Sequence, residues 1–230
     1  MPQSEPWPKI YREAPEIFEA FSRAEDPEGL VVQRLWELAG FPGRRILEIG
    51  CGTGRYSQAL APGTAGYFAL EPNPGMLGLA KRGPGEGPHL VRARGQALPL
   101  RDQSVDLVVA SWVLAYLRPE VMTSVIKEAY RVLRPGSGRG IWLVENHWTG
   151  AFQALRERAG FGGEPGVKRL IEDHGFQVRD VIETELRFPS GAEAEYVLGA
   201  LCGSEVRKRL ANEPRAALGH HIVLLHHPPV

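Results

Sequence analysis

Residues 46–54 constrain the fold of this chain more than any other stretch. The segment begins as a short apolar run that contains Glu48, and it ends in three alternating glycines, Gly50, Gly52 and Gly54. Glycine adopts backbone angles that other residues avoid, and it lets a ligand approach the main chain closely. A buried strand that runs through such a loop into a helix is a common ligand-binding device. The segment therefore predicts a strand, a glycine-rich loop and the start of a helix.

The composition fits one well-packed domain and excludes several classes of protein. The chain has 230 residues, of which 43% are hydrophobic, and its formal net charge is zero. Because there is no basic excess, nucleic acid is not favoured as a partner. The two cysteines, Cys51 and Cys202, cannot form a disulfide framework, which indicates a cytoplasmic location. No apolar run approaches the ~18 residues of a transmembrane helix, so we expect no membrane segment.

The residues around the glycine loop alternate between strand-like and helical patterns. Strands are predicted at 45–49, 66–70, 90–93, 105–110, 140–145, 176–188 and 221–225. Helices are predicted at 55–61, 74–81, 119–133, 150–159, 167–174 and 192–210, and two more within 11–39, the second capped by Asp26; residues 160–166 are expected to form a mobile loop. Such alternation predicts βαβ units and a mostly parallel sheet with helices on both faces. The two late strands, with a helical insertion between them, indicate an antiparallel edge.

Two acidic residues restrict the kind of ligand that the glycine loop could bind. The dinucleotide fingerprint requires glycine at the sixth position, where this chain has Arg55. A carboxylate at Glu48 would repel a pyrophosphate, whereas it suits an ammonium or sulfonium group. Glu71 ends the next strand, about 20 residues after the first glycine, where an acidic side chain can bind the hydroxyls of a ribose. Together these features fit S-adenosylmethionine.

Four segments of the chain resemble the class I S-adenosylmethionine-dependent methyltransferases. Residues 48–54 resemble their first motif and residues 71–77 their second. Residues 97–106 and 128–136 resemble the branch of ubiquinone- and menaquinone-biosynthesis and small-molecule methyltransferases. The resemblance extends from about residue 44 to residue 146.

This resemblance implies a fold and a domain organisation. The expected fold is α/β, a Rossmann-like three-layer sandwich with a seven-stranded, mostly parallel sheet in the order 3-2-1-4-5-7-6 and an antiparallel last strand. Residues 1–40 would form a helical cap or lid. Residues 41–230 would form the S-adenosylmethionine-binding domain, with a helical insertion near 190–212 that also caps the substrate side.

The resemblance also implies which residues bind the cofactor. The methionine end would be held by Glu48 and the loop backbone, the ribose by Glu71, and the carboxylate by residues of the N-terminal helices. Many relatives have an acidic residue that accepts from the adenine amine, where this chain has Arg94, Gly95 or Gln96; only Gln96 offers a side-chain acceptor. The complete predicted set is Tyr11, Arg23, Glu48, Gly50, Cys51, Gly52, Gly54, Glu71, Pro72, Met76, Gln96, Ala97 and Ser111.

Residues after the fourth and fifth strands are the candidates for chemistry. A methyl acceptor should lie at the carboxyl ends of these strands. Direct displacement depends mainly on orientation and desolvation, and it requires a base only when the acceptor must lose a proton. His147 is the first candidate for this base and Tyr116 the second; a structural role is the alternative for His147. Trp112 and Trp148 form either an aromatic wall for the substrate or ordinary packing.

Other chemistry is less favoured. His220-His221 and His226-His227 flank the last strand, and a separation of ~20 Å at ~3.3 Å per residue prevents one metal ion from joining them. The segment 111–114, Ser-Trp-Val-Leu, replaces the Asn-Pro-Pro-Tyr pattern of base and amide methyltransferases. We therefore expect a small-molecule acceptor and no metal. The alternatives are a catalytically silent regulator that binds S-adenosylmethionine or S-adenosylhomocysteine, a methyltransferase of macromolecules, and a dehydrogenase.

Overall fold

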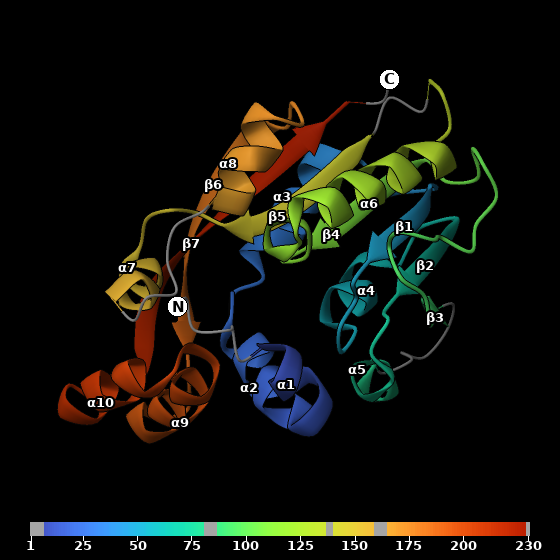
Figure 1. Cartoon of the computed structure of the whole chain (residues 1–230). Coiled ribbons are helices and arrows are strands. Elements are labelled where there is room, and N and C mark those ends of the chain that lie inside the picture. The colour runs from blue at the N-terminus through green and yellow to red at the C-terminus, as the bar shows by residue number, and fades with distance from the viewer. Residues whose placement is uncertain (1–6, 81–86, 137–139, 159–164, 229–230) are drawn as a thin grey trace. The chain divides into compact units, whose positions relative to one another are not determined.

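Seven strands of the described residues form one sheet. The computed structural model describes residues 7–80, 87–136, 140–158 and 165–228 (Figure 1). The strands are β1 (Arg45–Ile49), β2 (Gly66–Leu70), β3 (His89–Val91), β4 (Leu107–Ser111), β5 (Ile141–Asn146), β6 (Gln177–Arg187) and β7 (Ala217–His227). Their order is β3-β2-β1-β4-β5-β7-β6. The pairs β1–β2, β1–β4, β2–β3 and β4–β5 are parallel, and β5–β7 is antiparallel. The predicted fold class and strand order are confirmed.

Helices precede, separate and follow these strands. They are α1 (Trp7–Glu13), α2 (Pro15–Ala24), α3 (Leu30–Ala39), α4 (Arg55–Leu60), α5 (Pro74–Leu79), α6 (Pro119–Val132), α7 (Ala151–Arg158), α8 (Pro165–Glu172), α9 (Gly191–Cys202) and α10 (Ser204–Asn212), with a 3-10 turn, η1 (Leu114–Tyr116). Among the described residues, no helix has the length and apolar character needed to cross a membrane.

The described residues divide into two compact units. The sheet unit consists of the described residues of Val32–Glu145, Pro165–Asp180 and Val223–Val230. The helical unit consists of those of Met1–Val31, Asn146–Glu164 and Val181–Ile222. Each unit has its own cluster of buried apolar side chains.

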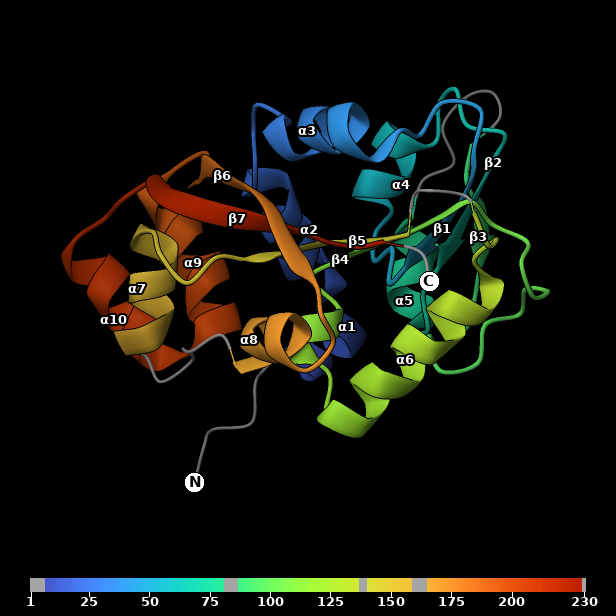
Figure 2. The ribbon, with the colours of Figure 1, turned by 90° about the horizontal axis from the view of Figure 1, so that it is seen from above.

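The core of the sheet unit follows from the alternation of side chains along its strands. Leu47 and Ile49 of β1 belong to the same apolar cluster as α6 and α8. Ile46 and Glu48 point to the other face, because successive side chains of a strand point to opposite faces. Figure 2 shows α3 on the opposite side of the sheet from α6 and α8. This alternation places the one acidic residue of β1 on the face covered by α4.

The helical unit packs α2 against α9. Phe21 of α2 lies 5.8 Å from Phe152 of α7, measured between ring centroids, and both belong to the apolar cluster that includes Val197 and Leu198 of α9. Asp26 fixes the start of α3, because its carboxylate accepts the main-chain N–H groups of Leu30 and Val31 at 3.0 and 2.9 Å.

Several predicted elements and boundaries were wrong. The N-terminal segment contains three helices, because Pro15 disfavours helical angles at Ala14 and separates α1 from α2. The predicted helix at 192–210 is two helices, broken at Gly203, whose φ of 91° is readily adopted only by glycine. The last strand begins at Ala217, four residues earlier than predicted. Of the predicted loop at 160–166, residues 160–164 lie outside the described residues, and Pro165 already begins α8.

Candidate functional site

The glycine loop connects β1 to α4 at the carboxyl edge of the parallel strands. Gly50, Gly52 and Gly54 have positive φ angles of 77°, 55° and 82°. The N–H groups of Gly50 and Cys51 both donate to the carbonyl oxygen of Leu70, at 2.8 and 2.9 Å, so the loop is tied to the end of β2. A Cβ atom on Gly50 would lie 2.4 Å from Cγ2 of Val113. Both the backbone angle and the space at this position therefore require glycine.

Glu71 joins the glycine loop to the next βα turn. One carboxylate oxygen accepts the N–H of Gly52 at 3.1 Å, and the other accepts that of Asn73 at 2.8 Å. Asn73 in turn caps α5 by accepting the N–H groups of Gly75 and Met76. Burial raises the pKa of Glu71, and the two main-chain N–H groups offset part of that rise. Each carboxylate oxygen keeps a second lone pair with which it could accept from a ligand hydroxyl.

Glu48 lies deeper than the sequence suggested. Its side chain is 2% exposed, and one of its oxygens accepts hydrogen bonds from Ser57 Oγ of α4 and from Tyr67 Oη of β2, the latter at 3.1 Å. Burial raises the pKa of Glu48 to about 7, although these two hydrogen bonds act in the opposite direction. The Glu48 carboxylate thus lies buried beneath the loop, with a pKa close to physiological pH.

A cavity of about 330 Å³ opens beside the glycine loop. From the predicted set it is lined by Gly50, Pro72 and Gln96, together with Arg94 and Gly95. Apolar side chains complete the wall, among them Ile49, Leu70, Val113, Leu117 and Val125. Met76 is buried, with 2% exposure, and Ala97 is exposed. A mostly apolar cavity whose lining includes the amide of Gln96 and the side chain of Arg94 is suited to a flat heterocycle such as a purine.

The end of β4 carries two further signs of a ligand site. Ser111 Oγ is buried and has no hydrogen-bond partner among the described residues. Trp112 has a φ of 53°, which is rare for a bulky residue, and its N–H donates to the carbonyl oxygen of Val144 at 2.7 Å. Its ring lies 5.6 Å from that of Tyr56. Backbone strain and an orphan hydroxyl at a strand end are typical of functional positions.

Comparison with known proteins agrees with this geometry. Residues 47–138 match the family model described as a methyltransferase domain. A curated protein of Mycobacterium ulcerans, named only as an uncharacterized methyltransferase, is 33% identical over 170 residues, which cover 71% of this chain and 65% of that protein. The chain therefore spans just under two thirds of the length of that relative.

Residues 47–138 belong to a methyltransferase domain.

Solved structures share the fold of this methyltransferase domain. A chain from Anabaena variabilis, assigned as a methyltransferase of an antibiotic biosynthesis pathway, has a TM-score of 0.64 and 18% identity, and covers 90% of this chain and 99% of its own. The magnesium protoporphyrin IX methyltransferase of Synechocystis, solved with bound S-adenosylmethionine, has a TM-score of 0.55 and 16% identity. The match covers 96% of this chain and 89% of that chain. At these identities the likeness shows the fold alone.

Tyr116 lies on η1, directly after β4 of the methyltransferase domain, and its side chain is 38% exposed. The turn is anchored by Glu145, which accepts the N–H of Ala115 at 3.1 Å. Helix α8 approaches the turn so closely that a Cβ atom on Gly166 would lie 1.8 Å from the carbonyl oxygen of Ala115. The position of Tyr116 therefore depends on a glycine at residue 166.

His147 belongs to a cluster within the helical unit. Thr149 Oγ1 lies 2.7 Å from Nδ1 of His147 and 2.8 Å from Nδ1 of His221. Trp148, which is 47% exposed, stacks on His147 with ring centroids 4.0 Å apart. Because a hydroxyl has one hydrogen and two lone pairs, at least one of the two neutral imidazoles must donate its Nδ1–H to Thr149. One of the two rings then carries a bare Nε2, which can accept a proton.

The charge state of His147 suits a base. Burial lowers the pKa of His147, and the neighbouring His221 lowers it further. The ring is thus neutral at physiological pH, as a proton acceptor must be. Behind the cluster lies His220, 1% exposed, whose Nε2 contacts Oδ1 of Asn146 at 2.9 Å.

Three further predicted residues make contacts within their own units. Tyr11 of α1 packs edge-on against Phe18 at 5.2 Å, and Arg23 of α2 pairs with Glu19 at 3.1 Å. Cys51 is buried, and burial raises the pKa of its thiol. The described residues contain no group of three or more histidine, cysteine or acidic side chains arranged to hold a metal ion.

Sequence reasoning missed several partners of the predicted residues. Tyr67 pairs with Ile46 and so lies on the same sheet face as Glu48, a relation that depends on strand register. Ser57 has no sequence pattern that marks it. His221 is 72 residues from Thr149, so nothing local in the sequence could have joined them.

Proposed function

We propose that this chain transfers a methyl group from S-adenosylmethionine to a small-molecule acceptor by direct in-line displacement. The observation that carries the proposal is the combination of the cavity beside the glycine loop with Glu71, which is held at that loop by two main-chain N–H groups. The family match over residues 47–138 supports it.

The residues at the loop fit the cofactor. The free lone pairs of Glu71 suit the two ribose hydroxyls, and the slot lined by Pro72 and Gln96 suits the adenine. The orphan hydroxyl of Ser111 offers a hydrogen bond that no described residue takes. Glu48 acts on the cationic methionine end through its charge from beneath the loop. A role for Tyr11 and Arg23 at the carboxylate end rests on the family resemblance alone.

The protein's part in the reaction is orientation and proton removal. S-adenosylmethionine, when bound, supplies a methyl group on a sulfonium centre, and the departing group is the neutral thioether S-adenosylhomocysteine. The apolar wall of the cavity excludes water from the adenine end of the cofactor. We assign His147 as the base that takes the acceptor's proton, with Tyr116 as the second candidate. Thr149 and His221 orient the ring of His147.

The acceptor is proposed as a small molecule on chemical grounds. The strand-four segment lacks the pattern of base and amide methyltransferases, and the net charge of zero does not attract a polyanion. The name of the magnesium protoporphyrin IX methyltransferase shows that this fold serves one such acceptor. Membership of the quinone-biosynthesis branch and a cytoplasmic location stay predictions, the second resting on the low number of cysteines, two in the chain.

Calorimetry with S-adenosylhomocysteine tests the proposal. We expect the wild type to bind, and Glu71→Ala to bind about a hundredfold more weakly, because two charge-assisted hydrogen bonds are lost. Glu205→Ala is the control, since Glu205 is an exposed partner of Lys208 in α10. Failure of the folded wild type to bind would overturn the proposal. Binding without release of S-adenosylhomocysteine, in a screen of metabolites with S-adenosylmethionine, would instead favour the silent regulator.

A further inference from the structure

The segment after β3 forms one wall of the cavity. Residues 93–96 line the cavity, and the turn they begin is closed by a hydrogen bond from the N–H of Ala97 to the carbonyl oxygen of Arg94, at 3.0 Å. Leu98 follows and is buried, with 5% exposure. The position of this wall therefore depends on what holds the chain from Leu98 onward.

One face of α6 supplies that hold. Val125, Glu128 and Arg131 are spaced by three residues and so lie on the same side of the helix. Val125 lines the cavity, and a Cβ atom on Gly95 would lie 3.0 Å from it. The loop therefore contacts α6 directly at the cavity. Glu128 and Arg131 lie about one and two turns further along the helix.

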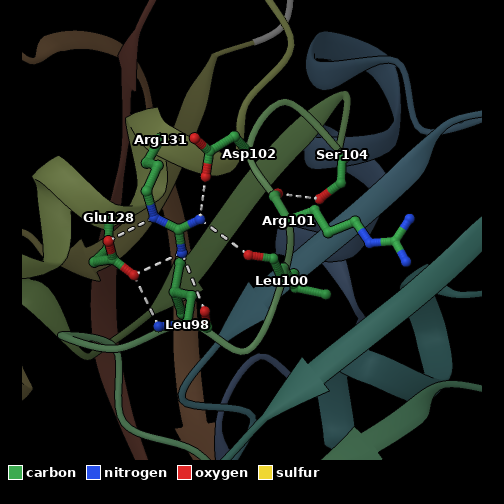
Figure 3. A network of polar contacts seen from close by, with 7 residues as sticks. All are labelled: Leu98, Leu100, Arg101, Asp102, Ser104, Glu128 and Arg131. Carbon is green, nitrogen blue, oxygen red and sulfur yellow. Dashed lines mark hydrogen bonds and ion pairs between the residues drawn. The ribbon is translucent and has the colours of Figure 1, made fainter.

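Glu128 and Arg131 bind the main chain of the loop (Figure 3). Glu128 accepts the N–H of Leu98 at 2.9 Å, and Arg131 donates to the carbonyl oxygens of Leu98 at 3.1 Å and Leu100 at 3.0 Å. The guanidinium also contacts both carboxylate oxygens of Glu128, at 2.7 and 2.8 Å, and Asp102 at 2.6 Å. We call these contacts of Glu128 and Arg131 with residues 98–102 the α6 clamp.

The clamp is specific to the geometry of arginine. Five donors in a planar fork can reach two carbonyl oxygens and two carboxylates at once, whereas the single ammonium of a lysine cannot. The ion pair with Arg131 lowers the pKa of Glu128, so the carboxylate stays charged at physiological pH. Figure 3 shows the side chain of Arg101, in the same loop, pointing away from the guanidinium of Arg131.

We propose that Glu128 and Arg131 are positioning residues for the adenine end of the cofactor site, a role that rests on the proposed function. They hold residues 94–97 in the bound arrangement before the cofactor arrives. Without them the wall must be ordered on binding, and the entropy of that ordering is subtracted from the affinity. Neither residue needs to touch the cofactor.

Arg131→Met, Arg131→Lys and a matched control test the clamp. The control is Arg134→Met, because Arg134 also bonds one main-chain carbonyl, that of Gln103, and one carboxylate, that of Asp106, but neither lines the cavity. Affinity for S-adenosylhomocysteine is measured by calorimetry at a temperature where circular dichroism shows each variant folded. Amide hydrogen exchange of residues 94–98 is measured without ligand.

We expect Arg131→Met to weaken binding about tenfold and to speed exchange at 94–98, since one ordered loop is lost. Arg131→Lys should fall between it and the wild type, and Arg134→Met should leave both quantities within about twofold of the wild type. Equal affinity and exchange in folded Arg131→Met and wild type would overturn the clamp. Equal losses in the Arg131→Met and Arg134→Met variants would also overturn it, because the effect would then be general destabilisation. If the wild type itself does not bind, the proposed function fails instead.

Discussion

The glycine-loop region and the histidine cluster differ in how they are built. The loop region is built from consecutive βα elements of the sheet unit. Its acidic side chains, Glu48 and Glu71, are buried and accept hydrogen bonds from neighbouring main-chain or side-chain groups. The cluster of His147, Thr149 and His221 belongs to the helical unit and joins residues that are far apart in the sequence. Trp148 beside it is 47% exposed.

This difference indicates that the two regions have separate roles. Under the proposed function the buried loop region holds the cofactor, in a geometry fixed by parallel strands and positive-φ glycines. The more exposed cluster lies outside the matched residues 47–138, and under the same proposal it serves the acceptor. Substitutions in the two regions should therefore separate cofactor binding from turnover.

The largest effect is expected from a pair of glycine substitutions. Gly50→Ala puts a Cβ atom 2.4 Å from Val113 at a φ of 77°, so we expect no detectable binding of S-adenosylhomocysteine. Gly150→Ala, at a φ of 102° beside the main chain of His221, should leave that binding unchanged. Calorimetry compares the two. If folded Gly150→Ala failed to bind S-adenosylhomocysteine, the claim that the two regions act separately would be contradicted.

The next effect concerns the histidine cluster. With an acceptor found by metabolite screening, His147→Asn should lower turnover about a hundredfold, in the range of general base catalysis, while the affinity for S-adenosylhomocysteine stays constant. Thr149→Val should lower turnover less, because the His147 ring loses its orientation but keeps the nitrogen that accepts the proton. Nitrogen-15 NMR of the imidazoles should show that at least one of His147 and His221 carries its proton on Nδ1 in the wild type. Unchanged turnover in His147→Asn would leave the cluster a structural feature.

The smallest effect is an opposite dependence of stability on pH. The pKa of Glu48 is about 7 in the folded state against 4.5 when exposed, so the folded state binds more protons in this interval, and the free energy of unfolding falls as pH rises through it. Burial lowers the pKa of His220 to about 3 from 6.5, so here the unfolded state binds more protons, and the free energy of unfolding falls as pH drops below 6.5.

Urea unfolding at pH 5.5 and pH 7.5 measures both contributions. Relative to the wild type, Glu48→Gln should gain about 1–2 kcal/mol between the lower and the higher pH, and His220→Gln should lose about 1 kcal/mol. The charged groups that face His220 are Glu25, at 3.7 Å, Arg156 and His221. A change of the same sign in both variants would contradict the assigned burial of one of the two groups.

Local patterns predicted most of the sheet. The strands at Arg45–Ile49 and Gly66–Leu70 were predicted to the residue, because apolar runs between glycines leave little choice. The helix break at Gly203 was missed, since a single glycine is compatible with a continuous helix until its φ is known. The cofactor residues could be named from motifs, but the burial of Glu48 under Tyr67 depends on strand register. The bond between Thr149 and His221 depends on tertiary packing, which no short pattern encodes.

The central claim is that the sheet unit holds the cofactor. Amide hydrogen exchange with and without S-adenosylhomocysteine tests it most directly, because it reports on every segment at once. We predict slower exchange in the ligand complex at residues 49–54, 71–77 and 94–98, and no change at 147–149 and 220–222. Protection confined to the histidine cluster, with none at the glycine loop, would contradict the account.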